Sequence, residues 1–161
     1  TGLVIYDFFN KALNTATRGI AAYGFLISKV HFRAAIIPLV KISSELIMHI
    51  IILIIVLIIL LFSGIPFTIY WLQIFYYLFA TVFLLTGLTW LTSSLALFFP
   101  DIKYIITIVM RVLFFFTPIF WQVKSIPDHM VIFFRLNPLF YIVEGYRNSL
   151  LYNIPFWIFF P

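Results

Sequence analysis

The segment from Leu46 to Pro100 contains no Asp, Glu, Lys or Arg. Within it, the residues from Ile50 to Leu61 are continuously aliphatic, whereas the strands of a membrane barrel alternate polar and apolar residues, so the segment is predicted to be helical. About 20 helical residues are enough to cross a hydrocarbon core of about 30 Å. Because a Ser-Gly-Ile-Pro turn signal at 63–66 divides the segment, its pattern predicts two membrane spans joined by a tight reversal.

The pattern predicts three complete spans in all. The first is 38–62, because Pro38 is tolerated in the first turn of a helix and marks its start. The second is 71–99, which opens with aromatic residues typical of a membrane interface: Tyr70, Trp71, Tyr76 and Tyr77. After a short polar link, 102–121 forms a shorter third span that Thr117-Pro118 interrupts near its far end.

The flanking segments have a mixed pattern. Residues 3–13 are apolar but few, and they are predicted to be the tail of a span whose start is missing, with an interfacial segment as the alternative. Residues 16–30 can be written as an amphipathic helix at the membrane surface. In 124–152, apolar blocks too short to span alternate with Pro-containing turns, which predicts two short external re-entrant helices or, alternatively, a loosely ordered external loop.

The composition agrees with a polytopic all-α membrane protein. Hydrophobic residues make up 65% of the chain and charged residues 9%, against about 25% charged in soluble domains. The absence of cysteine excludes disulfides, iron–sulfur sites and thiol catalysis. Because no initiator Met is present and the chain stops in a new apolar segment, we expect 1–161 to be a single transmembrane domain truncated at both ends.

The formal charge of +5 is best interpreted as a topological signal, since the basic residues are dispersed beside the spans and do not form a nucleic-acid-binding patch. Four of them precede the first complete span: Lys11, Arg18, Lys29 and Arg33. The loop 63–70 has none, so the positive-inside rule places the first segment in the cytoplasm and 63–70 outside. By alternation, 101–103 is internal and the chain from 122 onward is external.

No hydrolytic, redox or metal-binding constellation is visible in the sequence. Glu45 with His49 provides too few ligands for zinc. Gly19 and Gly24 have the separation of the glycines in a P-loop, but Phe25-Leu26 stands where Lys and Ser or Thr would hold phosphate and magnesium. No catalytic residue is therefore assigned, and if ATP drives this protein, another chain binds it.

Polar residues do occur inside the predicted spans. Lys41, Glu45 and His49 follow one another at i,i+4 spacing and form one stripe on the first complete span. Arg111 lies at a similar depth in the third span, and a charge in hydrocarbon is costly unless it is paired or hydrated. We expect a Glu45–Arg111 interhelical pair, with separate snorkelling or separate exposure to an aqueous cavity as the alternative.

Aromatic residues form 21% of the chain. Lipid contact and interface belts account for most of them. The alternative is that some line a translocation path, since aromatic faces stack on sugar rings and cations. The candidates for such a path are Phe115, Phe116, Phe120, Trp121 and Tyr141.

Three stretches together resemble the membrane subunits of bacterial ABC-2 type polysaccharide exporters, and most closely the teichoic-acid translocation permeases. The first begins at Tyr23 (YGFLISKVHFRAAIIPLVKI), where Arg33 replaces an expected proline. The second begins at Trp90 and ends in a span with Thr-Pro-Ile-Phe. The third begins at Ile126 and contains Leu-Asn-Pro and Glu-Gly-Tyr-Arg.

This resemblance implies a homodimer of six-helix subunits, each paired with a separate ATPase that holds ATP and Mg. The fragment would lack the first span and most of the last. The resemblance further implies that 14–33 contains a cytoplasmic coupling helix and that the re-entrant pair caps the external exit. The implied contacts with the ATPase are Tyr23, Gly24, Phe25, Leu26 and Lys29.

The expected function is ATP-driven export of a lipid-linked glycopolymer, with wall teichoic acid as the expected cargo, across the bacterial plasma membrane. Lys29, Arg33 and Lys41 are candidates to attract the diphosphate of the lipid carrier, or they are simple topological charges. The alternatives are another cargo, namely O-antigen, capsular polysaccharide or a small drug, and a membrane scaffold or integral transferase without transport.

Overall fold

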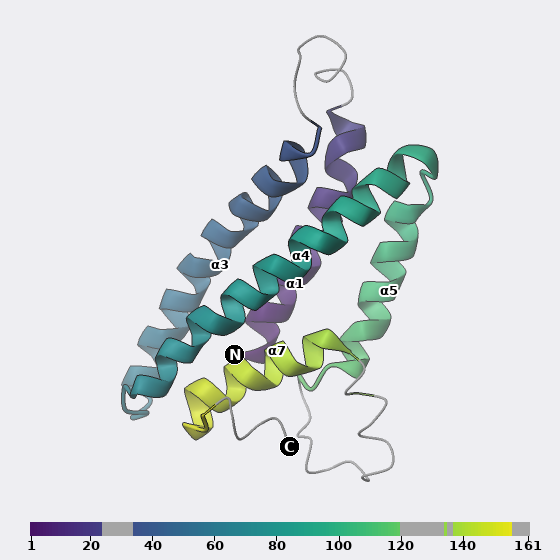
Figure 1. The fold of residues 1–161 in the computed structure, drawn as a ribbon. Coiled ribbons are helices and arrows are strands. Elements are labelled where there is room, and N and C mark those ends of the chain that lie inside the picture. The colour runs from purple at the N-terminus through teal and green to yellow at the C-terminus, as the bar shows by residue number, and fades with distance from the viewer. Residues whose placement is uncertain (24–33, 120–133, 135–136, 156–161) are drawn as a thin grey trace.

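The computed structural model describes residues 1–23, 34–119, 134 and 137–155. Within these ranges every regular element is helical, which confirms the predicted all-α class (Figure 1). The elements are α1 (Gly2–Ala22), α3 (Ile36–Phe62), a 3-10 turn η1 (Ile69–Leu72), α4 (Gln73–Phe98), α5 (Ile102–Phe116), α7 (Pro138–Arg147) and a π-helical turn η3 (Asn148–Tyr152).

Helix α1 lies at the centre of the bundle and packs against α3, α4, α5 and α7. Its buried apolar side chains recur at helical spacing from one end to the other: Ile5, Phe8, Phe9, Ala12, Leu13, Ala16 and Ile20. This stripe has no break at the polar residues that suggested a change of structure, because those residues lie on another face. The predicted short segment 3–13 and the start of the predicted coupling region 14–33 therefore belong to one 21-residue helix.

Helix α3 begins two residues before its predicted start and ends where predicted, at Phe62. It ends in a Schellman motif, in which Gly64 N–H donates to Leu61 O and Ile65 N–H donates to Leu60 O. Gly64 has a φ of 81°, a left-handed conformation that glycine adopts without steric cost. Most of its large aliphatic side chains stay exposed, as expected of a surface that faces lipid.

Helix α4 follows η1 directly, and together they cover the predicted span 71–99 except its last residue, Phe99. Its buried stripe carries several small hydroxyl residues: Thr81, Thr89, Thr92 and Ser93. Small residues allow membrane helices to approach closely, and hydroxyls bond across the interface. Here the hydroxyls of Thr92 and Thr17 lie 2.8 Å apart and join α4 to α1. Among the described residues, α3 and the η1–α4 segment are long and apolar enough to cross a membrane.

Helix α5 is shorter than the predicted span 102–121. It ends at Phe116, and Thr117 turns to an extended conformation with ψ 135°. The cause is Pro118, since a proline ring disfavours helical geometry at the preceding residue. With 15 residues, α5 is about 22 Å long, less than a full hydrocarbon core.

The connections gather at two ends of the bundle (Figure 1). The C-terminal end of α1, the N-terminal end of α3 and the α4–α5 turn lie at one end, which we call the inner end after the charge-based prediction. The α3–α4 turn and α7 lie at the other, the outer end. Alternation of the helices produces this grouping, and the side of the membrane on which each end lies stays a prediction. Of the predicted re-entrant region 124–152, residues 124–133 and 135–136 lie outside the described residues, and the rest contains α7 and η3.

Candidate functional site

One face of α1 carries polar and charged residues at helical spacing: Asp7, Asn10, Lys11, Asn14 and Arg18. The side chains bond along the helix. Lys11 Nζ lies 2.6 Å from Asp7 Oδ2, and Asn14 Nδ2 donates to the carbonyl and side-chain oxygens of Asn10, each at 2.9 Å. This arrangement of i,i+4 pairs keeps the polar face ordered on a helix whose other face is the apolar core.

The polar face forms the floor of a cleft of about 1000 Å³ between α1, α5 and the inner end of α3. The cleft combines polar and aromatic walls. It is lined by Leu3, Tyr6, Asp7, Asn10, Lys11, Asn14, Thr15, Arg18, Gly19, Ala22, Tyr23, Lys41, Thr107, Arg111, Phe114 and Phe115.

Helix α5 is joined to α1 by polar contacts across this cleft. The hydroxyl of Thr107 lies 2.9 Å from Asn14 Oδ1 and equally far from the carbonyl of Lys103, and it can donate to either oxygen. Arg18 donates to the same hydroxyl at 3.5 Å. Nearer the outer end, Tyr6 donates to the carbonyl of Met110. Met110 is the one buried α5 side chain, and Ile106, Leu113 and Phe114 pack partly buried against the core beside these polar contacts.

The electrostatic balance of the cleft is positive. Its lining has four basic side chains, those of Lys11, Arg18, Lys41 and Arg111, and one carboxylate, that of Asp7. In the described part of the chain, only Lys11 among the four has an acidic partner. Cavities lined by one sign of charge concentrate counter-ions, so this cleft attracts anions.

The predicted Glu45–Arg111 pair is not formed in this structure. Glu45 instead accepts a hydrogen bond from Thr15 at 3.4 Å, and Arg111 lines the cleft without an acidic partner among the described residues. The reason is the position of α1, which packs against both α3 and α5. Glu45 and Arg111 line two different cavities, and the alternative, in which each snorkels or faces an aqueous cavity separately, stays a prediction.

His49, the third predicted intramembrane polar residue, lies in the protein interior away from the large cleft. Its ring stacks on Phe8 with centroids 4.7 Å apart, and Nε2 lies 3.5 Å from the hydroxyl of Tyr146. With Glu45, Asp7 and other residues it lines a separate cavity of about 80 Å³. His49 therefore connects α3 to α1 and α7 through packing.

The predicted coupling and path residues are placed as follows. Tyr23 ends α1 and lies in the cleft, where Lys41 donates to its hydroxyl at 3.2 Å and lies over its ring. Phe115 also lines the cleft. The ring centroids of Phe116 and Phe134 lie 5.6 Å apart, and on α7 the ring of Tyr141 contacts that of Phe140. Predicted residues outside the described ranges are Gly24, Phe25, Leu26, Lys29, Phe120 and Trp121.

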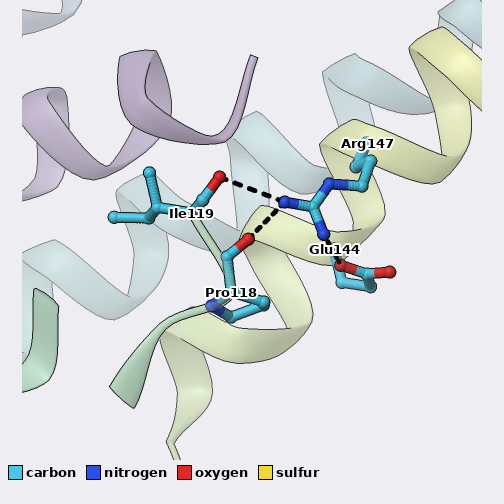
Figure 2. A network of polar contacts seen from close by, with 4 residues as sticks. All are labelled: Pro118, Ile119, Glu144 and Arg147. Atoms are coloured by element: carbon cyan, nitrogen blue, oxygen red, sulfur yellow. Dashed lines mark hydrogen bonds and ion pairs between the residues drawn. The ribbon is translucent and has the colours of Figure 1, made fainter. Parts of the chain in front are cut away.

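A second polar cluster ties α7 to the end of α5 (Figure 2). Arg147 forms an ion pair with Glu144 at 2.9 Å and donates to the backbone carbonyls of Pro118 and Ile119, the latter at 3.2 Å. Two backbone carbonyls just beyond the end of α5 thus accept hydrogen bonds from a charged donor. The Glu-Gly-Tyr-Arg motif is buried as a whole, and in this structure it holds helices together.

Asn137 and Pro138 account for the Leu-Asn-Pro motif in the same way. Asn137 caps α7 by accepting from the Leu139 N–H at 3.0 Å, and Pro138 occupies the first helical position. The Asn137 amide also donates to Thr117 Oγ1 at 3.1 Å, beside the break in α5.

The polar face of α1 and its partner Thr107 were not predicted from the sequence. Lys11 and Arg18 were interpreted as topological charges, and Asn10 and Asn14 were assigned no role. A signal was available, because positions 7, 11, 14 and 18 fall on one helical face. This spacing is meaningful only if one helix continues through the change of composition near Asn10.

Comparison with known families matches residues 13–151 to the ABC-2 type transporter family. Among curated proteins, no match is found. Members of this family are transmembrane, non-catalytic components, and membership implies pairing with an ABC ATPase subunit. The match covers most of the chain, and the structure is an α-helical bundle with two helices able to span a membrane. The chain therefore belongs to the ABC-2 type transporter family as a membrane permease component.

Proposed function

We propose that this chain is the membrane-spanning part of an ATP-driven exporter that carries a lipid-linked anionic glycopolymer across the bacterial plasma membrane, with wall teichoic acid as its cargo. The observation that carries the proposal is the positively charged cleft between α1, α5 and the inner end of α3 in a chain of the ABC-2 family. Four basic side chains beside one carboxylate are suited to a polymer that bears phosphate groups.

The other side chains of the cleft fit a glycan. Asn10, Asn14 and Thr107 offer amide and hydroxyl groups that exchange hydrogen bonds with sugar hydroxyls. Tyr6, Phe114 and Phe115 supply aromatic surface on which sugar rings stack. A path with both kinds of wall accommodates a polymer in which sugars or polyols alternate with phosphates.

Energy for transport would come from a partner. We propose that two such permeases form a homodimer and bind two copies of an ABC ATPase, which hold ATP and Mg. The coupling surface would include Tyr23, which ends α1 at the inner end and contacts Lys41 on α3. A push on this end reaches α1 directly, and α1 packs against four other helices.

The test uses the full-length permease co-expressed with its ATPase and reconstituted in vesicles. We expect the ATPase to co-purify, and we expect transport of a lipid-linked glycerol-phosphate polymer in preference to a neutral glycan of equal length. Equal transport of the two cargoes would exclude the anionic assignment and favour a neutral O-antigen or capsular polysaccharide. Failure of any ATPase to co-purify would overturn the exporter proposal and favour a membrane scaffold.

The coupling surface is tested with Tyr23→Ala. Because Tyr23 lies at the inner end and 39% of its surface is exposed, its loss is expected to weaken ATPase co-purification at least several-fold. Tyr104→Ala is the matched control, since Tyr104 is an exposed tyrosine of α5 near the same end of the bundle. Equal effects of the two changes would argue against a specific role for Tyr23.

A further inference from the structure

We propose that Arg18 and Arg111, with Asn14 and Thr107 between them, form a binding site for a phosphate ester or diphosphate group. The site lies within the cleft, on its two facing walls. The inference rests on the proposed function, because it assigns the part of the cleft that recognises the diphosphate linking the cargo to its lipid. It replaces Lys29, Arg33 and Lys41, which the sequence suggested as the residues that attract the diphosphate. Of these, Lys29 and Arg33 lie outside the described residues.

The geometry brings the Arg18 guanidinium to a hydroxyl of the facing helix, on the side where Arg111 also lines the cleft. Arg18 on α1 donates to Thr107 Oγ1 at 3.5 Å, and Asn14 Oδ1 lies 2.9 Å from the same atom. On α5, Arg111 follows Thr107 by four residues, so the two lie on the same face about 6 Å apart. One ligand between α1 and α5 can therefore reach a cation from each wall.

The two arginines are available for a ligand. Neither has a carboxylate partner among the described residues, and the 3.5 Å contact of Arg18 is at the long limit of a hydrogen bond. Guanidinium groups bind phosphate through paired N–H donors, and two of them match the charge of a diphosphate. The Thr107 hydroxyl can rotate from its present acceptors and donate to a phosphate oxygen.

The depth of the site explains why the ligand is lipid-linked. Arg111 lies eight residues, or about 12 Å, along α5 from Lys103, on a helix that packs against α4, which is long and apolar enough to cross a membrane. A charge at membrane depth is costly unless an opposite charge or water accompanies it, and a diphosphate supplies that charge. The exposed apolar side chains beside the site on α5 offer a surface for the lipid tail: Ile105, Ile108 and Val112.

The experiment measures binding to the full-length permease–ATPase complex in nanodiscs made of zwitterionic lipid. Three probes are titrated: a long-chain polyprenyl diphosphate, inorganic pyrophosphate and phosphatidylglycerol. Polyprenyl diphosphate is expected to bind tightest, and Arg18→Gln and Arg111→Gln are each expected to weaken its binding at least 10-fold. Arg111→Lys is expected to restore part of the loss, because it keeps the charge and removes the paired donors.

Lys103→Gln is the matched control. It removes one positive charge from α5 two turns from Arg111, outside the cleft lining. Binding by this variant is expected to equal that of the unmodified complex. An equal loss in Lys103→Gln and Arg111→Gln would overturn the site, since it would reduce the effect to general charge. ATPase co-purification and thermal stability of each variant separate loss of binding from loss of folding.

The outcomes distinguish this site from the proposed function. If the complex transports the lipid-linked polymer and the arginine variants bind as before, the site is wrong and the function stands. If Arg111→Gln abolishes diphosphate binding but the complex transports no lipid-linked polymer, the site stands and the function is wrong. Equal affinity for phosphatidylglycerol would overturn the carrier assignment and make the site one for membrane phospholipid.

Discussion

Gly145 lies where α7 meets the ring of Tyr77 on α4, and a Cβ at this position would overlap that ring. The absence of a side chain therefore sets how closely the two helices approach. Tyr146, the next residue, is fully buried and reaches His49 on α3. The glycine and the tyrosine of the motif thus act together, one allowing the approach and the other filling the space beneath α7.

Gly145→Ala is expected to lower the free energy of unfolding by about 1–3 kcal/mol, the range for an overpacked core. Thermal unfolding of the full-length protein in detergent measures the loss. Gly87→Ala is the control, because a Cβ at Gly87 meets no atom within 4 Å, and it is expected to be neutral or slightly stabilising. Tyr77→Leu added to Gly145→Ala is expected to recover stability; no recovery would contradict the proposed overlap.

Arg147 satisfies a buried carboxylate and two backbone carbonyls at once. Arg147→Gln leaves Glu144 buried without its ion-pair partner, so a loss of about 3–5 kcal/mol in stability is expected. Arg147→Gln combined with Glu144→Gln is expected to be more stable than the single change, because no unpaired charge remains. Chemical denaturation of the two variants provides the comparison, and equal stabilities would show that the ion pair is not the source of the loss.

At the scale of elements, α1 and α4 meet through small residues and one hydroxyl pair. Thr17→Val removes the contact with Thr92, and a loss of about 0.6 kcal/mol is expected, the average for a hydrogen bond between membrane helices. Thr86→Val is the control, because Thr86 bonds only to the Val82 carbonyl of its own helix. Detergent-induced unfolding measures the stability of both variants. If both lose the same amount of stability, the interhelical hydrogen bond makes no net contribution.

Helices α3 and α4 could be predicted almost to the residue, because long apolar runs and a Ser-Gly-Ile-Pro turn are local signals. Helix α1 could not, because its polar residues face a cleft made by other helices and resemble a loop when read along the chain. The same limit explains the missed Glu45–Arg111 arrangement. Depth along each helix can be counted from the sequence, but the angular position of α1 between α3 and α5 depends on packing.

At the scale of the whole molecule, the arrangement has two distinct ends, and the chain offers a clean test of which end faces the cytoplasm. It contains no cysteine, so a single introduced thiol reports its own position without background. Phe67→Cys, at an exposed site in the α3–α4 turn, is expected to react with a membrane-impermeant maleimide in intact cells. Asp101→Cys, in the α4–α5 turn, is expected to react only after permeabilisation.

The reverse labelling pattern would invert the predicted orientation of the molecule. Labelling of both sites in intact cells would indicate a leak or a mixed topology, and a permeabilised sample with Phe67→Cys as reference separates these two cases. The prediction rests on the four basic residues that precede α3, of which Lys11 and Arg18 lie on α1.

The hydrogen bonds from Arg147 to the carbonyls of Pro118 and Ile119 have a mechanical consequence. It fastens the outer tip of α5 to α7, and α7 in turn packs on α1 and α4. Elsewhere α5 contacts the bundle through Met110, its one buried side chain, and through the partly buried Ile106, Leu113 and Phe114. Under the proposed function, a tilt of α5 that admits cargo at the inner end is expected to pivot about this fastened tip and to pull on α7.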